Sequence, residues 1–471
     1  MFTIKYYLFR QCKVFFSDFF FNNIAQNSAA SFVNLYETTW KKQTWKKHHN
    51  HHSIMKKNIL SFILILLCNS MVVSQNTEIV KAIDENAFEI KEVDPSIELE
   101  KSAILDTIFK NVRIFGFGEA THGTKEFFNL KIKFFKYLVK NQGVKNFAIE
   151  ASYGNCIAIN NFIHGEDGDS RVLLSDIGFW TWNCKEVLDL IEWMKAYNID
   201  KNTNDQLSFI GFDSMDCTIA AKIMYNYIND SSIQNKEECL KIIGMYIKEQ
   251  NIKSANKKGL KNHLAAMTDL RTILNNNAVD SSDFYVRTQE AIIQYIEFSL
   301  NHNQTTRDTQ MAENVNKLLT SAGTESKVFL WAHNLHVNKN KMEPKIPSMG
   351  HHLKEKYGNQ YYSVAFDFAT GKFNAFDISK NRLTTIVIDN VMKNTSSEIF
   401  DKSAFDTYLL DFKTAIKASV LDDYLNSKVI HQRIGSTYNP KMVVQEKLIN
   451  SFDAIIFVKN TTESTLLNNQ K

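Results

Sequence analysis

The most regular pattern of apolar and polar residues runs from Arg113 to Glu150. An apolar run over 114–117 ends at Gly118 and predicts a short strand. Apolar residues then recur at spacings of three and four, with Lys residues between them, and predict an amphipathic helix: Phe127, Leu130, Phe134, Phe135 and Leu138. A second apolar run predicts a strand over 146–149. The segment is therefore expected to be a strand–helix–strand unit of a parallel sheet.

The same patterns predict further elements downstream. Strands are expected over 207–212 and 327–332, followed by two strands, 361–368 and 373–378, that are joined by a turn at Gly371. Helical spacing is found over 186–197, over 307–319 and throughout 217–303. Alternating strands and helices predict an α/β fold: a central, mostly parallel sheet flanked by helices, with an inserted helical subdomain.

We divide the chain accordingly. Residues 75–110 are expected to form an N-terminal arm and helix, and 111–216 the first part of the α/β domain. Residues 217–304 form the helical subdomain in this prediction, and 305–465 complete the α/β domain.

The first 74 residues are expected to lie outside the folded protein, as an over-extended gene start followed by a signal peptide. Residues 1–54 show no sustained period and end in the His-rich tract 48–52, which could bind a metal, but we favour an over-extended gene start with Met55 as the initiator. Residues 55–74 combine a basic start, an apolar core and small residues before Gln75, and predict a signal peptide, with a retained anchor as the alternative. Export to the periplasm or the exterior follows, with no stable membrane span after cleavage.

Composition narrows the function classes. The chain has 471 residues, 44% hydrophobic and 23% charged, enough for one large domain or two. Its formal charge is +4, but residues 1–74 carry +7, so the remainder carries −3. A body that is close to neutral, without a basic stripe, argues against nucleic acid as a partner.

Ionisable residues stand where four of the predicted strands end: Glu119 and His122, Glu150, Asp213, and His333 with His336. In open α/β sheets, ligands bind at the carboxyl ends of the strands. Taken singly, each residue could be a helix cap or a buried structural His, but the coincidence of four strand ends favours an acid–base site. A His whose other nitrogen contacts a carboxylate can deprotonate water.

Other catalytic signatures are missing from the sequence. It has no G-x-S-x-G, no H-E-x-x-H and no G-x-G-x-x-G, and the spacing of its cysteines fits no zinc pattern. We expect no cofactor and no bound metal. A metal held by His333, His336 and the acids stays an alternative, since imidazole and carboxylate suit several ions.

Five segments carry a family resemblance: GEATHGTKEF, FAIEAS, GFDS, RDTQMAEN and WAHNLHV. On these segments the chain, from about Asn111 to Val458, resembles the erythromycin esterase family. Specific spacings accompany them: three residues from Glu119 to His122, twenty-eight from His122 to Glu150, and three between the two later histidines. In that family the His of the first motif is taken as the general base that activates water, without a covalent serine intermediate.

The resemblance implies a role for each matching residue. His122 becomes the base, Glu119 and Glu150 the active-site acids, and His333 and His336 the second His pair. Where the antibiotic-inactivating members carry Arg, this chain has Lys131, which keeps the charge but loses the planar fork. We assign Lys131, Trp180 and Asp213 to substrate binding, although a tryptophan of this kind is more often a core residue.

The predicted function is therefore an exported hydrolase of a small-molecule ester or macrolactone, with macrolide inactivation, and so antibiotic resistance, as one candidate activity. Two alternatives remain at this stage. One is a metal-dependent hydrolase, and the other is a non-enzymatic protein that binds haem or a small apolar ligand.

Overall fold

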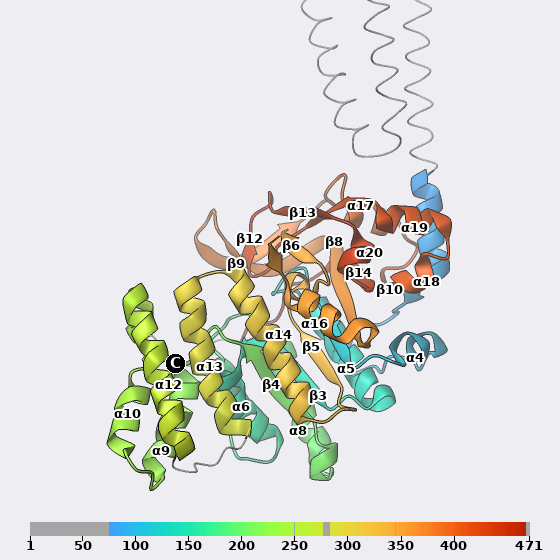
Figure 1. The fold of residues 1–471 in the computed structure, drawn as a ribbon. Helices are drawn as coiled ribbons and strands as arrows, with labels where there is room; N and C mark the ends of the chain where they lie inside the picture. Colours follow the sequence, from blue (N-terminus) through green and yellow to red (C-terminus); the bar gives the residue numbers. More distant parts are fainter. Residues whose placement is uncertain (1–74, 249, 277–282, 344, 468–471) are drawn as a thin grey trace, which may run out of the picture.

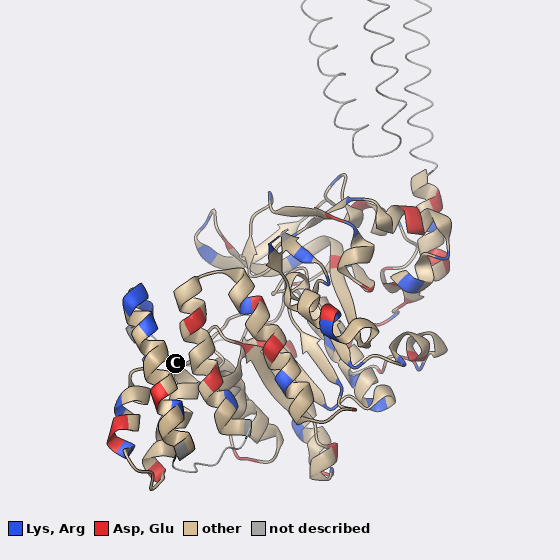
Figure 2. Ribbon diagram, in the orientation of Figure 1, with Lys and Arg blue, Asp and Glu red and all other residues tan. Residues whose placement is uncertain are grey.

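The computed structural model describes residues 75–248, 250–276, 283–343 and 345–467, which Figure 1 draws in colour. The predicted gene start and signal peptide lie outside these residues. None of the described helices combines the length and the apolar character that crossing a bilayer requires. Lys and Arg are interspersed with Asp and Glu along the helices of the chain (Figure 2).

A central sheet organises the molecule (Figure 1). Its main path follows the order β1 (Phe88–Glu89), β10 (Thr407–Asp411), β14 (Ala454–Thr461), β8 (Tyr361–Asp377), β2 (Ile114–Phe117), β5 (Val328–Trp331), β3 (Asn146–Ser152) and β4 (Ser208–Asp213). Strands β9 (Arg382–Ile388) and β12 (Thr437–Tyr438) also pair with β8. From β14 to β4 every pair on this path is parallel. This confirms the predicted α/β class.

Strand β5 lies between β2 and β3, pairing in parallel with both. The strand–helix–strand unit predicted at the start of the domain is therefore present, but its two strands are not neighbours. The consequence is that the residues after β5 are placed between those after β2 and those after β3.

Successive side chains of each strand point to opposite faces of the sheet, and helices bury both faces. Ile114 points into one core and Phe115 into the other. One face is covered by α4 (Ala103–Phe109), α5 (Lys125–Gln142) and α8 (Lys185–Asn198), and the other by α14 (Gln304–Ser321) and α16 (Met349–Tyr357). Burial on both faces explains why the strands read as continuous apolar runs.

The helices predicted after β4 are α9 (Thr218–Asp230), α10 (Lys236–Gly244), α11 (Gln250–Lys253), α12 (Lys257–Asn276) and α13 (Asp283–Asn301). They share a hydrophobic core of their own, which includes Met224, Ile243, Leu270 and Ile296. The group lies beside the β4 edge of the sheet (Figure 1), where α9 and α13 contact α6 (Tyr153–Ile163). The domain limits at 217 and 304 stay a prediction.

Strand β8 corrects one prediction. Its 17 residues continue through Gly371, where a turn was expected. A Cβ at Gly371 would lie 2.2 Å from the Thr461 carbonyl oxygen, so this glycine serves the close approach of β14. Strand β9 pairs antiparallel with 371–377 and holds them extended.

Short elements complete the chain. They are α7 (Ser170–Ser175), η1 (Thr203–Asp205), α15 (Asn334–Val337), β6 (Lys341–Glu343), β7 (Ile346–Pro347), η2 (Gly358–Gln360), α17 (Ser396–Phe400), α18 (Phe412–Ala415), α19 (Ser419–Asn426), β11 (Val429–Gln432), β13 (Val443–Glu446) and α20 (Leu448–Ser451). The cysteines at 156, 184, 217 and 239 are buried, and no disulfide joins them in the described part of the chain.

Candidate active site

The turn after β2 carries the first acid and the first histidine. Glu119 follows Gly118, at which a Cβ would lie 2.2 Å from the Asn334 side-chain oxygen, so glycine allows α15 to pack against this turn. The Glu119 Oε1 atom lies 2.5 Å from His122 Nδ1. This contact places the imidazole proton on Nδ1 and leaves Nε2 with a free lone pair, which is the arrangement of a general base.

Glu119 is held from behind by two further donors. Its Oε2 accepts hydrogen bonds from Lys131 Nζ at 2.5 Å and from Trp331 Nε1 at 2.9 Å. Lys131 has no exposed surface, and burial lowers its pKa to about 8, although the Glu119 carboxylate limits the fall. A side chain in this position suits a residue that holds Glu119, rather than one that contacts a ligand as predicted.

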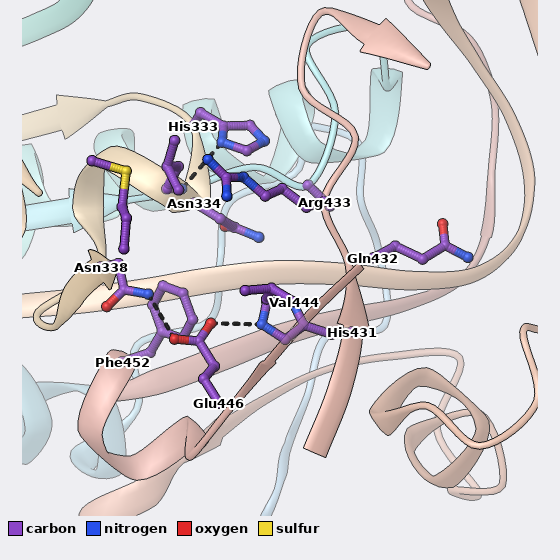
Figure 3. A pocket seen from close by; sticks show the side chains of 12 residues that line it. His333, Asn334, Asn338, His431, Gln432, Arg433, Val444, Glu446 and Phe452 are labelled. Carbon is purple, nitrogen blue, oxygen red and sulfur yellow. Dashed lines mark hydrogen bonds and ion pairs between the residues drawn. The ribbon is translucent and has the colours of Figure 1, made fainter. Parts of the chain in front are cut away.

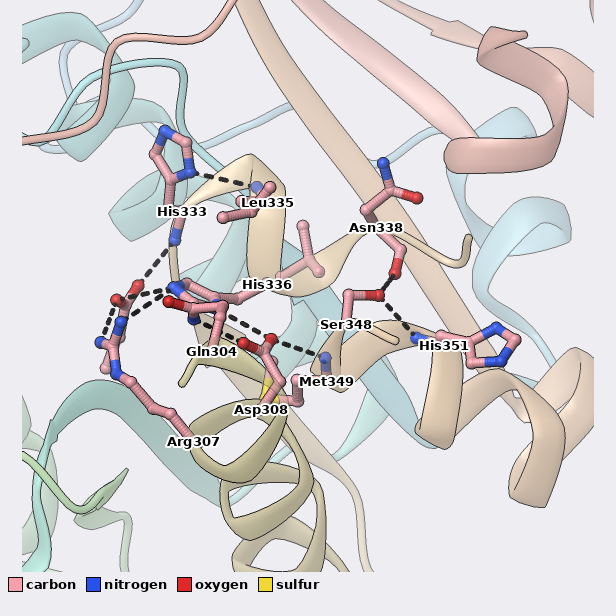
Figure 4. A network of polar contacts seen from close by, with 12 residues as sticks. Gln304, Arg307, Asp308, His333, Leu335, His336, Asn338, Ser348, Met349 and His351 are labelled. Atoms are coloured by element: carbon pink, nitrogen blue, oxygen red, sulfur yellow. Dashed lines mark hydrogen bonds and ion pairs between the residues drawn. The ribbon is translucent and has the colours of Figure 1, made fainter. Parts of the chain in front are cut away.

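Glu150, near the carboxyl end of β3, is the centre of a second buried cluster. Figure 4 shows Arg307, His333 and His336 of this cluster. Its Oε1 lies 2.7 Å from Arg307 Nη2, and its Oε2 accepts the backbone N–H of His333 at 2.9 Å. The Arg307 guanidinium also binds Asp213 through Nε and Nη2, at 3.0 and 2.6 Å. Burial would raise the pKa of Glu150, but His336 and Arg307 outweigh it and hold this pKa well below its ordinary value.

His336 lies between two carboxylates. Its Nδ1 is 2.9 Å from Asp308 Oδ1 and its Nε2 is 3.2 Å from Glu150 Oε1. Burial would lower the pKa of His336, but the two carboxylates raise it to about 10. We therefore place a proton on each ring nitrogen, so the 3.3 Å approach of Arg307 Nη1 to Nε2 is a contact between donors and not a hydrogen bond.

His333, in contrast to His336, has a lowered pKa and a neutral ring. Its Nδ1 accepts the backbone N–H of Leu335 at 3.1 Å, which places the proton of the neutral ring on Nε2. Burial first, and then the nearby His122, hold the pKa of His333 well below its ordinary value. Among the described residues, Nε2 is buried without a hydrogen-bond partner. His333 thus presents a neutral N–H donor.

The rings of His122 and His333 lie 5.2 Å apart, centre to centre. One presents a lone pair and the other a proton, so they complement a water and a carbonyl oxygen respectively. His333 also lines a cleft of about 420 Å³, partly open to solvent, together with Asn334, Arg433 and Glu446 (Figure 3). His333 thus forms part of the cleft wall, and its Nε2–H is buried without a hydrogen-bond partner among the described residues.

The segment between β11 and β13 closes one side of the site. Gly435 donates its N–H to Ala120 O at 3.0 Å and accepts the backbone N–H of His122 at 3.2 Å. A Cβ at Gly435 would lie 3.5 Å from His333 Nε2 and 3.9 Å from His122 Cδ2. Glycine keeps the space between the two rings open.

The structure brings together all five residues predicted as catalytic, and Asp213 through Arg307. Trp180 is half-buried, and the indole that packs against the His122 ring, at 5.8 Å between centroids, is that of Trp182. Sequence reasoning missed Arg307 and Asp308, although both stand in the segment RDTQMAEN, and it missed Trp331 and Gly435. In the described residues, no three His, Cys, Asp or Glu side chains converge as a metal site.

Fold and site together define an α/β protein with an acid–base site at the carboxyl edge of a parallel sheet. The erythromycin esterase family matches residues 139–461, and the chain belongs to that family. "Putative hydrolase YbfO" of Bacillus subtilis (strain 168) is 21% identical over 470 residues, covering 88% of this chain and all of that protein. "Erythromycin esterase type II" of Escherichia coli is 22% identical over 307 residues, 57% of this chain and 71% of that protein.

Solved structures show the same fold. A Bacillus cereus protein superposes with a TM-score of 0.74 at 22% identity, over 83% of this chain and 99% of that one. A mutant of erythromycin esterase EreC, in its open conformation, superposes with a TM-score of 0.56 at 16% sequence identity, over 78% of this chain and 95% of that one. Family membership and these relatives support a hydrolase that acts on a small molecule.

Proposed function

We propose that the chain hydrolyses an ester or a lactone with water activated by His122. The observation that carries the proposal is the pair of neighbouring imidazoles, His122 with a lone pair on Nε2 and His333 with a buried N–H that no described residue accepts, beside a cleft that His333 lines. A neutral His that donates to a developing oxyanion and a His–carboxylate pair that acts as base are the two components that water-mediated acyl transfer requires.

The reaction proceeds in two steps. His122 Nε2 takes a proton from water as the water oxygen attacks the carbonyl carbon, and Glu119 stabilises the imidazolium that forms. The carbonyl oxygen gains negative charge and accepts the His333 Nε2–H bond. When the tetrahedral intermediate collapses, the ester C–O bond breaks and His122 returns the proton to the leaving alkoxide, giving an acid and an alcohol.

The remaining residues position this pair. Lys131 and Trp331 fix the Glu119 carboxylate, which in turn orients His122. Glu150 fixes the backbone of His333. Arg307, which Asp213 binds, and His336 hold Glu150 charged. In this proposal the two later histidines have different roles: His333 donates a hydrogen bond to the substrate, and protonated His336 supports Glu150.

Mass spectrometry of erythromycin, simple lactones and simple esters incubated with the purified protein tests the proposal. We expect at least one substrate to gain the mass of one water, and this gain to fall by at least ~100-fold in His122→Ala. The exposed His164 provides the control His164→Ala, which should keep full activity. Hydrolysis that survives in His122→Ala would overturn the mechanism. A protein that binds a coloured or apolar ligand and hydrolyses none of the panel would overturn the function.

We also propose that the protein is exported, because residues 55–74 have the pattern of a signal peptide. Fractionation of cells that express the full chain should place a protein with Gln75 as its N-terminus outside the cytoplasm. A cytoplasmic protein that retains residues 55–74 would contradict this.

A further inference from the structure

Arg433 lines the cleft and has no part in the proposed reaction. Its half-buried side chain lines the cleft and extends toward His333 (Figure 3). Among the described residues its guanidinium forms no hydrogen bond and no ion pair. Five donors in a fixed planar fork thus belong to a cleft whose wall also includes His333, with its buried and unpartnered Nε2–H.

The carboxylate that lines the same cleft does not neutralise Arg433. Glu446 Oε1 lies 2.6 Å from His431 Nε2. Glu446 Oε2 accepts the Asn338 amide at 3.0 Å and also accepts the Ser451 hydroxyl. Both oxygens are therefore occupied, and they are held on the hairpin of β11 and β13 rather than turned toward Arg433.

A guanidinium without a partner, next to a buried N–H donor, is complementary to a planar anion. Carboxylates accept two parallel hydrogen bonds from arginine, and such pairs gain strength where water is partly excluded. The charge of Arg433 also acts on His333, since it is among the charges that lower the pKa of that ring after burial and His122. The guanidinium is thus close to the place that the proposed mechanism gives to the carbonyl oxygen.

We propose that Arg433 binds a carboxylate carried by the substrate itself, next to the ester or lactone carbonyl that lies between His122 and His333. The inference rests on the proposed hydrolysis and names its substrate class: an acidic ester or lactone in preference to a neutral one. Arg433 is then a specificity residue, contributed by the hairpin and not by the sheet.

A matched pair of esters tests the preference. Mono-(4-nitrophenyl) glutarate and 4-nitrophenyl pentanoate have acyl chains of equal length that end in a carboxylate or a methyl group. We expect kcat/KM to favour the glutarate ester by at least ~10-fold, the scale of a charge-assisted pair. The ratio should approach one in Arg433→Met and be intermediate in Arg433→Lys, which keeps the charge but loses the fork. The exposed Arg382 gives the control Arg382→Met, which should keep the ratio.

Two outcomes would overturn the inference. One is an equal kcat/KM for both esters in the wild-type protein. The other is an equal loss for both esters in Arg433→Met, which would make Arg433 a stabiliser of the oxyanion common to both.

Binding separates this inference from the hydrolase itself. Calorimetric titration with free glutarate should give a Kd at least ~10-fold weaker in Arg433→Met than in wild type, and the same contrast should persist in the His122→Ala background. If neither ester is hydrolysed but glutarate binding depends on Arg433, the anion site stands and the proposed function fails. If the esters are hydrolysed but glutarate binds equally well to both proteins, the anion site fails.

Discussion

His122 Nδ1 lies 2.5 Å from Glu119 Oε1, so the histidine of the first motif contacts a carboxylate with no exposed surface. Replacing Glu119 by Gln keeps the shape but removes the charge that stabilises the His122 imidazolium. We expect kcat for a substrate found in the panel of esters and lactones to fall by about 10²–10⁴, as when a carboxylate behind a catalytic histidine becomes an amide. The exposed Glu98 gives the control Glu98→Gln, which should leave kcat unchanged. Wild-type turnover in Glu119→Gln would refute the pairing as functional.

Lys131 and Glu119 form an ion pair in which both side chains are fully buried. Lys131→Met leaves the Glu119 charge without its cation, and breaking a buried pair costs about 3–5 kcal/mol of unfolding free energy. Lys140→Met, which breaks an exposed pair with Glu98, should cost at most ~1 kcal/mol. Urea denaturation of the two variants measures the difference. Equal losses would mean that Lys131 is not a structural partner of Glu119.

His333 has a neutral, buried Nε2–H that no described residue accepts. His333→Ala should lower kcat by about 10²–10³, the cost of losing one oxyanion donor, with a smaller change in KM. His333→Gln carries an amide donor and should recover part of kcat. Steady-state kinetics on both variants decides the matter, and a loss confined to KM would show that His333 binds substrate without acting on the oxyanion.

The raised pKa of His336 predicts that the stability of the protein depends on pH. Burial would lower its pKa, but Glu150 and Asp308 raise it from 6.5 to about 10. A raised pKa means that protonated His336 contributes stability that is fully present below pH 6.5 and is lost as the pH rises toward 10. The difference in unfolding free energy between wild type and His336→Asn should therefore shrink from pH 6 to pH 9. A constant difference across this range would contradict the imidazolium assignment.

Gly435 and Gly143 have the same φ, +69°, but different surroundings. Alanine at either position pays a similar cost for left-handed backbone. At Gly143 nothing lies within 4 Å of the added Cβ, whereas at Gly435 it approaches His333 Nε2 and His122 Cδ2. Both variants should lose similar stability. Gly435→Ala should also lose at least ~10-fold in kcat/KM, since its methyl group would lie at van der Waals distance from both rings and occupy the space next to the reacting atoms. Thermal denaturation and kinetics on the pair separate the two effects, and equal kinetics would show that Gly435 does not border the reacting space.

Part of this molecule follows from local sequence alone. Apolar runs bounded by polar turns located the strands that lead to Glu119, Glu150, Asp213 and His333, because a strand buried on both faces leaves a continuous apolar signal. The carboxyl-edge rule then placed these residues together. One local signal misled: Gly371 suggested a turn, but its missing Cβ makes room for Thr461 across the sheet.

The order of the strands was decided only by the tertiary structure. Nothing near β5 indicates that it inserts between β2 and β3, about two hundred residues earlier in the chain, yet this insertion sets His333 beside both Glu119 and Glu150. The same holds for Arg307, Gly435 and Arg433, which come from a helix and a distant hairpin. A sequence determines which groups are available and at which strand ends they stand. Proton positions, charge states and open space depend on long-range contacts, and only the folded chain decides those.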